Sequence, residues 1–280
     1  MKKAILFFAF VFTMGTLSAQ SNISNLRQNG NDNTADVAQR GSTNVSLVTQ
    51  DQDDNLVEVS QNGALNVSEV AVSGGSNVVS LTQIGDANSG VSIVTEGSNA
   101  ILLSQEGNNN NVRQEVANSN SAVTAIQQGN QNNTIQTQSG AGQNIMFSQQ
   151  VGNNNLSTQE QVGENSNIFV NQIGDNSSSV ILQNGLSNNV ALNQEGVGNS
   201  AAVSQIGNNN FAGGENEVLL DQFGDNNTLL LTQEGNENAS SILQTGNGNS
   251  AINSQVGQAN NSIIEQAGAR NTATVSQSEN

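Results

Sequence analysis

Polar and apolar residues alternate along short stretches of this chain, and residues 227–238 (NTLLLTQEGNEN) show the pattern clearly. Every second residue from position 227 to position 233 reads Asn, Leu, Leu, Gln, and a turn containing Gly235 follows. Alternate side chains of a β-strand share one face, so this stretch predicts a strand with one buried face. A single strand cannot bury that face alone. The pattern therefore predicts many copies stacked on one another.

The Gln that ends this strand recurs along the chain at a nearly fixed interval, the one that separates Gln222 from Gln233. Val occupies the position at Val72, Val94 and Val116. Inward Gln side chains on stacked strands can bond to one another along the stack, as in the ladders of cross-β fibres. We predict such a structural ladder at all the remaining positions: Gln28, Gln39, Gln50, Gln61, Gln83, Gln105, Gln127, Gln138, Gln150, Gln161, Gln172, Gln183, Gln194, Gln205, Gln222, Gln233, Gln244, Gln255, Gln266 and Gln277.

The turns between the strands also repeat, with the pattern Gly-x-x-Asn. Glycine adopts a positive φ without strain, and Asn both tolerates it and bonds its neighbouring backbone. The predicted turn glycines are Gly30, Gly85, Gly185, Gly196, Gly235 and Gly246. The Asn that opens each strand is predicted to form a second structural ladder, at Asn33, Asn44, Asn88, Asn188, Asn199, Asn227, Asn238, Asn249, Asn260 and Asn271.

Two intervals of the Gln series, from Gln138 to Gln150 and from Gln205 to Gln222, are longer than the rest. We expect both insertions in turns, near residues 139–143 and 208–215, because a slip within a strand would turn its buried side chains outward. On this expectation the strand pattern resumes in phase at Asn144 after the first insertion. After the second it resumes with Asn216, Val218, Leu220 and Gln222.

The exceptions to the repeat distinguish a solenoid from an antiparallel meander. Val72, Val94 and Val116 follow one another at twice the single-strand interval, and polar residues intrude at a core position with the same step at Gln114 and Gln136. In a meander Gln would oppose Asn, whereas in a solenoid with two strands per coil like stacks on like. The sequence therefore predicts an all-β fold, a two-sheet parallel β-solenoid whose strand-turn-strand coils of 22 residues number about eleven, each rising about 4.8 Å.

The N-terminal segment, residues 1–19, differs from the repeat and has the features of an export signal. Lys2 and Lys3 precede an apolar run at positions 5–12, and Leu17-Ser18-Ala19 fits a cleavage site. We expect residues 1–19 to be a signal peptide and residues 20–280 to be a single repeat domain. The protein is then secreted.

Composition removes several classes of function. From residue 20 onward the chain has four Arg and 23 acidic residues, which leaves a net charge of −19. Such a surface repels nucleic acid. Without His or Cys, and without Lys after the leader, the common catalytic bases and nucleophiles are absent, so we expect no enzymatic activity and no cofactor.

Two surface features have alternative interpretations. Asp51, Asp53 and Asp54 share one turn and are weak candidates for binding Ca²⁺, although a solvated acidic turn is the simpler reading. Outward positions such as Phe147 and Phe169 could form a sticky surface, or be the scattered apolar exposure that is normal for proteins.

The repeat resembles the curlin repeat of bacterial curli fibre subunits, in which a Gln-x-Gly-x-x-Asn segment is followed by a small residue and a second Gln. Residues 28–39 and 194–205 both fit this pattern, and the resemblance covers nearly the whole chain after residue 19. It implies a secreted, cell-surface subunit of extracellular functional-amyloid fibres that serve biofilm matrix and adhesion. It also implies as partners a nucleator subunit, an outer-membrane secretion pore and periplasmic chaperones.

The repeat begins close to Gln20 and continues to Gln277, so we expect both ends of the solenoid to lack caps. Bare ends present unpaired backbone groups and favour adding another subunit. We predict that Asn22 and Gln28 at one end, and Asn271 and Gln277 at the other, are the polymerisation ends. The alternative function is a monomeric secreted β-solenoid that acts as an adhesin or a ligand-binding surface protein.

Overall fold

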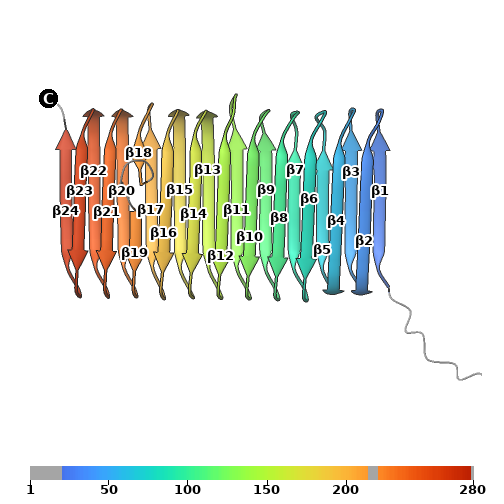
Figure 1. Ribbon diagram of the computed structural model, residues 1–280, viewed down its shortest axis with the longest axis horizontal. Helices are drawn as coiled ribbons and strands as arrows, with labels where there is room; N and C mark the ends of the chain where they lie inside the picture. The colour runs from blue at the N-terminus through green and yellow to red at the C-terminus, as the bar shows by residue number, and fades with distance from the viewer. Residues whose placement is uncertain (1–20, 214–219, 279–280) are drawn as a thin grey trace, which may run out of the picture.

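The computed structural model describes residues 21–213 and 220–278, which form one elongated stack of strands (Figure 1). The strands are β1 (Ile23–Asn29), β2 (Thr34–Ser42), β3 (Val45–Asp51), β4 (Leu56–Ala64), β5 (Val67–Val72), β6 (Val78–Ile84), β7 (Ser89–Val94), β8 (Ala100–Glu106), β9 (Asn111–Ala117), β10 (Ala122–Gln128), β11 (Asn133–Ser139), β12 (Ile145–Val151), β13 (Leu156–Glu164), β14 (Asn167–Ile173), β15 (Ser178–Leu186), β16 (Asn189–Glu195), β17 (Ser200–Ile206), β18 (Phe211–Ala212), β19 (Leu220–Phe223), β20 (Thr228–Asn236), β21 (Ala239–Thr245), β22 (Ser250–Gln258), β23 (Asn261–Ala267) and β24 (Thr272–Ser278).

Successive strands alternate between two parallel sheets. The first sheet, here sheet A, runs from β1 through the odd-numbered strands to β17 and then through β20, β22 and β24. The second, sheet B, contains β2 to β16, then β18 and β19, β21 and β23. In the regular coils each residue pairs with its equivalent one coil later, as in Gln28 with Gln50 and Gln39 with Gln61. The predicted two-sheet parallel β-solenoid with 22-residue coils is confirmed.

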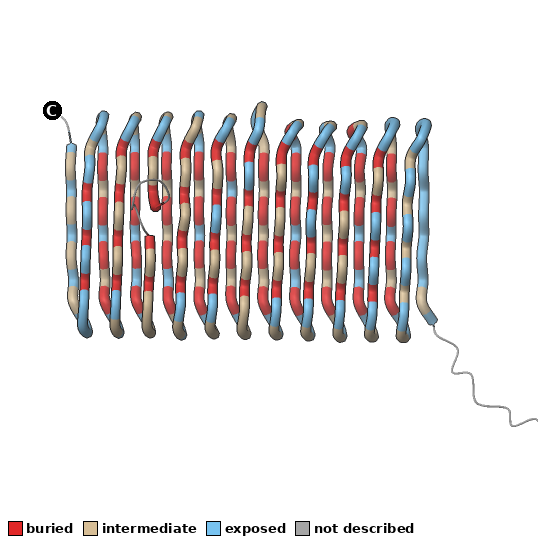
Figure 2. The backbone as a smooth tube through the Cα atoms, in the orientation of Figure 1, coloured by how far each residue is buried: buried red, intermediate tan, exposed pale blue. Residues whose placement is uncertain are grey.

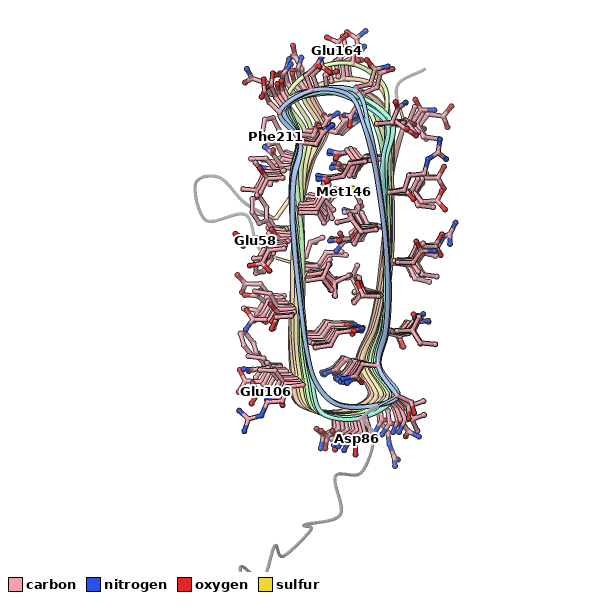
Figure 3. The ribbon with its side chains drawn as sticks, turned by 90° about the vertical axis from the view of Figure 1, so that its right-hand side faces the viewer. Glu58, Asp86, Glu106, Met146, Glu164 and Phe211 are labelled. Atoms are coloured by element: carbon pink, nitrogen blue, oxygen red, sulfur yellow. The ribbon has the colours of Figure 1, made fainter. Side chains whose placement is uncertain are left out.

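Viewed along the stack, each coil is a flattened ring whose inward side chains fill the space between the sheets (Figure 3). Apolar side chains at the two middle inward positions make the core, and Val57, Leu103 and Leu231 have no exposed surface. Inward and outward residues alternate along every coil, which gives the banded burial of Figure 2. The alternation that predicted the strands is therefore the division between core and surface.

The first insertion lies where the sequence places it, in the turn between β11 and β12, and Asn144 resumes the repeat beside Ser121. The second does not, so the prediction that it lies in a turn is wrong. Asn210 occupies the strand-opening Asn position, because its Oδ1 accepts the backbone N–H of Asn238 at 3.1 Å. Ala212 of β18 is fully buried and pairs with Ser240 of β21.

The second insertion therefore interrupts a strand, and the strand resumes with Leu220 of β19 opposite Ile242. The predicted positions Asn216 and Val218 lie outside the described residues. The sequence misled because Asn216, Val218 and Leu220 reproduce the spacing of a strand start. The strand keeps its register on both sides of the interruption, because β18 and β19 each pair with β16 and with β21.

The corners of the coils bring backbone very close to backbone. Gly129 has φ +118°, and a Cβ on it would collide with the carbonyl oxygen of Gly152 in the next coil. Side chains are excluded there by both the conformation and the lack of space. At Gly75 the nearest atom to such a Cβ is 3.3 Å away and φ is not positive.

Gly129→Ala should therefore lower the free energy of unfolding by about 3 kcal/mol. Backbone strain accounts for about 1–3 kcal/mol, and displacing the corner of the neighbouring coil adds a further cost. Gly75→Ala is the matched control and should change it by less than about 1 kcal/mol. Urea unfolding of freshly purified protein measures both. Equal effects at the two glycines would contradict the corner geometry.

Candidate interface at the ends of the solenoid

Inward Gln side chains form two hydrogen-bonded files that run the length of the solenoid. In sheet B the file is continuous from Gln39 to Gln266, and each Nε2 donates to the Oε1 of the Gln in the next coil at 2.7–3.0 Å. The second N–H of each amide bonds a backbone carbonyl of the facing sheet, as from Gln61 to Val45 at 3.0 Å. Every such bond points the same way, so the file has a donor end and an acceptor end.

In sheet A the file is broken at Val72, Val94 and Val116, and only one side of the break is compensated. Gln50 cannot bond a Val above it, and its Nε2 donates instead to the carbonyl of Asn55 at 3.0 Å. On the far side of the break the buried Oε1 of Gln138 has no partner in the described structure. One position nearer the middle, a substitute polar file begins at Ser92 and continues through Gln114, Gln136 and Gln159 with bonds of 2.9–3.1 Å.

The Asn that opens each strand fastens its corner to the next coil. Its Oδ1 accepts the backbone N–H of the Asn one coil later, as from Asn110 to Asn88 at 3.0 Å. Its Nδ2 donates to a corner carbonyl of that coil, as Asn88 does to Gly107 at 2.7 Å. These files contain the predicted Asn residues at 33, 44, 88, 188, 199, 227, 238, 249, 260 and 271.

The Asn files also contain residues that the sequence interpretation did not single out: Asn55, Asn66, Asn77, Asn99, Asn110, Asn132, Asn155 and Asn210. Ser121, Ser166 and Ser177 fill the same position in three places. Each of these residues except Asn210 precedes a position of the Gln series by the spacing between Asn227 and Gln233, so the sequence could have predicted them. Asn210 lacks this spacing because the second insertion separates it from Gln222. The predicted turn glycines 30, 85, 185, 196, 235 and 246 all lie at corners with positive φ.

The files end at two exposed pairs of strands. At one end every residue of β1 is exposed, and β1 and β2 pair only with β3 and β4 among the described strands. At the other end β23 and β24 pair only with β21 and β22 in the described structure. Leu26, which points inward in β1, is 44% exposed, whereas its counterpart Val48 one coil later is fully buried. The end coils therefore carry core residues without a covering coil in the described part of the chain.

The two exposed ends are chemically complementary. Gln277 and Gln266 each use one amide N–H on a carbonyl of the facing sheet and have a second that points off the stack. At the opposite end Gln28 and Gln39 donate into the stack, and their Oε1 atoms face outward along the axis. The side-chain oxygens of the Asn files point the opposite way, because Oδ1 of Asn22 accepts the backbone N–H of Asn44 and Oδ1 of Asn249 accepts that of Asn271. In the Gln files, one end thus presents amide donors and the other presents amide acceptors.

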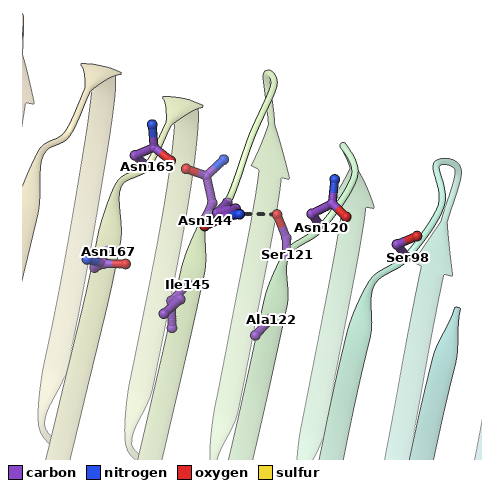
Figure 4. Close-up of a pocket in the computed structure, with 9 residues that line it drawn as sticks. Ser98, Asn120, Ser121, Ala122, Asn144, Ile145, Asn165 and Asn167 are labelled. Carbon is purple, nitrogen blue, oxygen red and sulfur yellow. Dashed lines mark hydrogen bonds between the residues drawn. The ribbon is translucent and has the colours of Figure 1, made fainter.

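Other features of the described surface offer less chemistry. A groove of about 570 Å³ follows the corners near the first insertion and includes Ser98, Asn120 and Asn167 (Figure 4). None of its nine lining residues is titratable. Within residues 21–213 and 220–278 no group of three or more acidic residues could hold a metal ion, and Asp53 instead accepts the backbone N–H of Asn31 at 2.7 Å. The same residues include no helix long and apolar enough to cross a membrane.

Comparison with known families identifies the repeat. A model of the curlin associated repeat matches residues 30–52, 53–85 and 224–252. The matched segments span corners and strands at both ends of the solenoid, including β2 to β6 and β20 to β21. No curated protein matches the chain.

One acidic side chain on the outer surface is poorly solvated. Asp221 of β19 lies beside Leu243 of β21, and burial raises the pKa of its carboxyl above the usual value of 3.8. Folding therefore favours the protonated form of Asp221. Below pH 3.8 the carboxyl is protonated in both the folded and the unfolded chain, and it does not lower the free energy of unfolding. As the pH rises through the raised pKa, the folded protein becomes less stable, because the unfolded chain ionises more easily.

Asp221→Asn should consequently raise the thermal unfolding midpoint at pH 7, and the gain should disappear near pH 3. Thermal scans of both proteins at the two pH values measure the difference. A gain that is equal at pH 3 and pH 7 would show that charge at this position is not the cause.

Proposed function

Because the chain carries curlin associated repeats in a two-sheet β-solenoid, we propose that it is a structural subunit that polymerises end to end into extracellular, curli-type fibres. The observation that carries the proposal is the complementarity of the two exposed ends. Amide donors of Gln266 and Gln277 at one end match amide acceptors of Gln28 and Gln39 at the other.

Docking of a second copy would continue every interaction that holds the coils together. The exposed edges of β23 and β24 would pair with strands of the next copy, and the half-covered core residues Val275 and Val37 would become buried. In a single copy Gln28 is exposed and Gln39 and Gln277 are half-exposed, and docking would bury all three. At the new junction the amide donors of one copy meet the acceptors of the next, and an amide left unpaired there would cost about 1–3 kcal/mol.

The proposal extends to the setting in which fibres form. Residues 1–19 act as a signal peptide, residues 20–280 form the single fibre domain, and the fibre lies at the cell surface as part of a biofilm matrix that supports adhesion. A nucleator subunit, an outer-membrane secretion pore and periplasmic chaperones are its partners. The excess of acidic residues on corners and outer faces, with Glu58, Asp86, Glu106 and Glu164 as examples (Figure 3), delays association during export. The proposal assigns the chain no catalytic role.

Purified chain beginning at residue 20 should pass from a soluble state to fibres after a lag. The fibres should bind amyloid dyes and give a meridional reflection at about 4.7–4.8 Å, since coils stack at that spacing. Dye fluorescence, negative-stain microscopy and fibre diffraction measure this. A monodisperse monomer that persists for days at high concentration would contradict the proposal and favour the monomeric adhesin.

A pair of variants separates the ends from the outer faces. Gln277→Ala removes a donor from the exposed end and should slow seeded elongation about fivefold or more, which corresponds to about 1 kcal/mol. Asp36→Ala, on the outer face of β2, is the control and should leave elongation unchanged or faster. Equal slowing by both variants would count against the ends as the docking surfaces.

A further inference from the structure

The described solenoid begins and ends on the same sheet. Its outermost strands, β1 and β24, both belong to sheet A, whereas β2 and β23 belong to sheet B. β18 and β19 together fill one strand position between β16 and β21. Sheet A therefore has one strand position more than sheet B, and this difference decides how two copies can meet.

A copy stacked by translation alone would leave a defect. Its β1 would pair with β24, but its β2 would then lie two strand spacings, about 9.6 Å, from β23. One strand would be missing from sheet B at every junction, with its row of N–H and C=O groups unpaired. A copy turned by half a rotation about the stack axis leaves no gap, because its β1 follows β23 and its β2 follows β24.

The half-turn is permitted because the two sheets are built alike. Gln50 of sheet A donates to the carbonyl of Thr34 in sheet B at 3.0 Å. Gln61 of sheet B donates to the carbonyl of Val45 in sheet A at the same distance. One strand further along the chain, the same bond thus recurs with the sheets exchanged. A half-turn with half a coil of rise therefore superimposes the regular coils on themselves.

We propose that successive subunits of the fibre are related by a half-turn about the fibre axis, so that β1 and β2 of one copy pair with β23 and β24 of its neighbour. The inference rests on the end-to-end polymerisation proposed above. The ladders then continue as Gln266 to Gln28 and Gln277 to Gln39.

Charge supports this arrangement independently. With Gln266 opposite Gln28, Glu265 of one copy lies beside Arg27 of the other, and both are exposed outward residues. Within its own chain Arg27 neighbours Thr49, and Glu265 neighbours Leu243, so neither has an opposite charge beside it in its sheet among the described strands. Translation alone would instead put Ser276 beside Arg27.

A second pair forms at the corner. With Gln277 opposite Gln39, Arg270 of one copy meets Asp32 of the other, and both residues hold the same left-handed corner conformation, with φ of 60° and 53°. In its own chain Asp32 is followed one coil later by another acid, Asp54, at the equivalent corner position. Two of the four Arg residues in the described chain thus find acids across a junction made with a half-turn.

The arrangement also predicts the surface of the fibre. The interrupted strand formed by β18 and β19 lies in sheet B. A half-turn between copies places this interruption on opposite faces of the fibre in alternate subunits. Translation would place all of them on one face.

Engineered disulfides test the junction directly, because the natural chain has no cysteine. Asn25 points outward in β1, opposite Ile263 in the proposed junction and opposite Thr274 in a translated one. Neighbouring strands are about 4.8 Å apart, within the range that a disulfide spans. Fibres of Asn25→Cys/Ile263→Cys should therefore link into covalent oligomers on oxidation, and those of Asn25→Cys/Thr274→Cys should not.

The outcomes separate this inference from the proposed function. Absence of fibres from the unmodified chain would overturn polymerisation itself. Fibres that cross-link through Thr274, through both positions or through neither would overturn the half-turn alone. Reduced samples of each double variant, followed by dye fluorescence, establish that the variants assemble before oxidation.

A charge-reversal series gives a second measurement that needs no cross-link. Glu265→Arg should slow seeded elongation about two- to fivefold, as expected for an exposed ion pair, and Arg27→Glu in the same chain should restore it. Glu69→Arg makes the same change in net charge in the interior of sheet A and should cause no slowing. Failure of the double variant to recover would contradict the pairing of Arg27 with Glu265.

Discussion

The structure depends on one repeated interaction, the hydrogen bond between a buried Gln amide and the amide of the equivalent Gln in the next coil. In sheet B this bond continues without a break from Gln39 to Gln266. A buried amide is costly unless both its N–H groups and its oxygen are paired. Identical amides in the two neighbouring coils pair the oxygen and one N–H, and a carbonyl of the facing sheet pairs the other N–H. That requirement fixes the length of the coil and the parallel register of the strands. It also allows insertions only where the strands on both sides keep their register.

The same requirement accounts for the ends and for the function proposed. Inside the stack each Gln of the file has a Gln neighbour on both sides, except Gln50 and Gln138 beside the Val break. At the ends, Gln28 and Gln277 have one neighbour each among the described residues. The interaction that stabilises the fold thus remains incomplete at the surfaces where another copy would bind. The Gln file of sheet A is broken from Val72 to Val116. Near this break a second file of polar side chains, from Ser92 to Gln159, pairs buried amides at another inward position.

Much of this could be predicted from the sequence, because each coil repeats the same chemistry and the exceptions, such as Val72, Val94 and Val116, recur at the step of one coil. The sheet assignment, the inward Gln and Asn positions and the first insertion all followed from spacing. The second insertion did not, since Asn216 and Leu220 imitate a strand start, and only the bonds of Asn210 show that the strand had already begun.

The most direct test of the amide ladder compares two adjacent Gln residues of β12. Gln150 is buried, accepts from Gln127 at 2.9 Å and donates to Gln172 at 2.8 Å, whereas Gln149 points outward. Gln150→Glu exchanges the donor for a buried carboxylate, and should lower the free energy of unfolding at pH 7 by about 3–5 kcal/mol. Gln149→Glu should change it by less than about 1 kcal/mol. Equal losses of stability in urea unfolding would contradict the account.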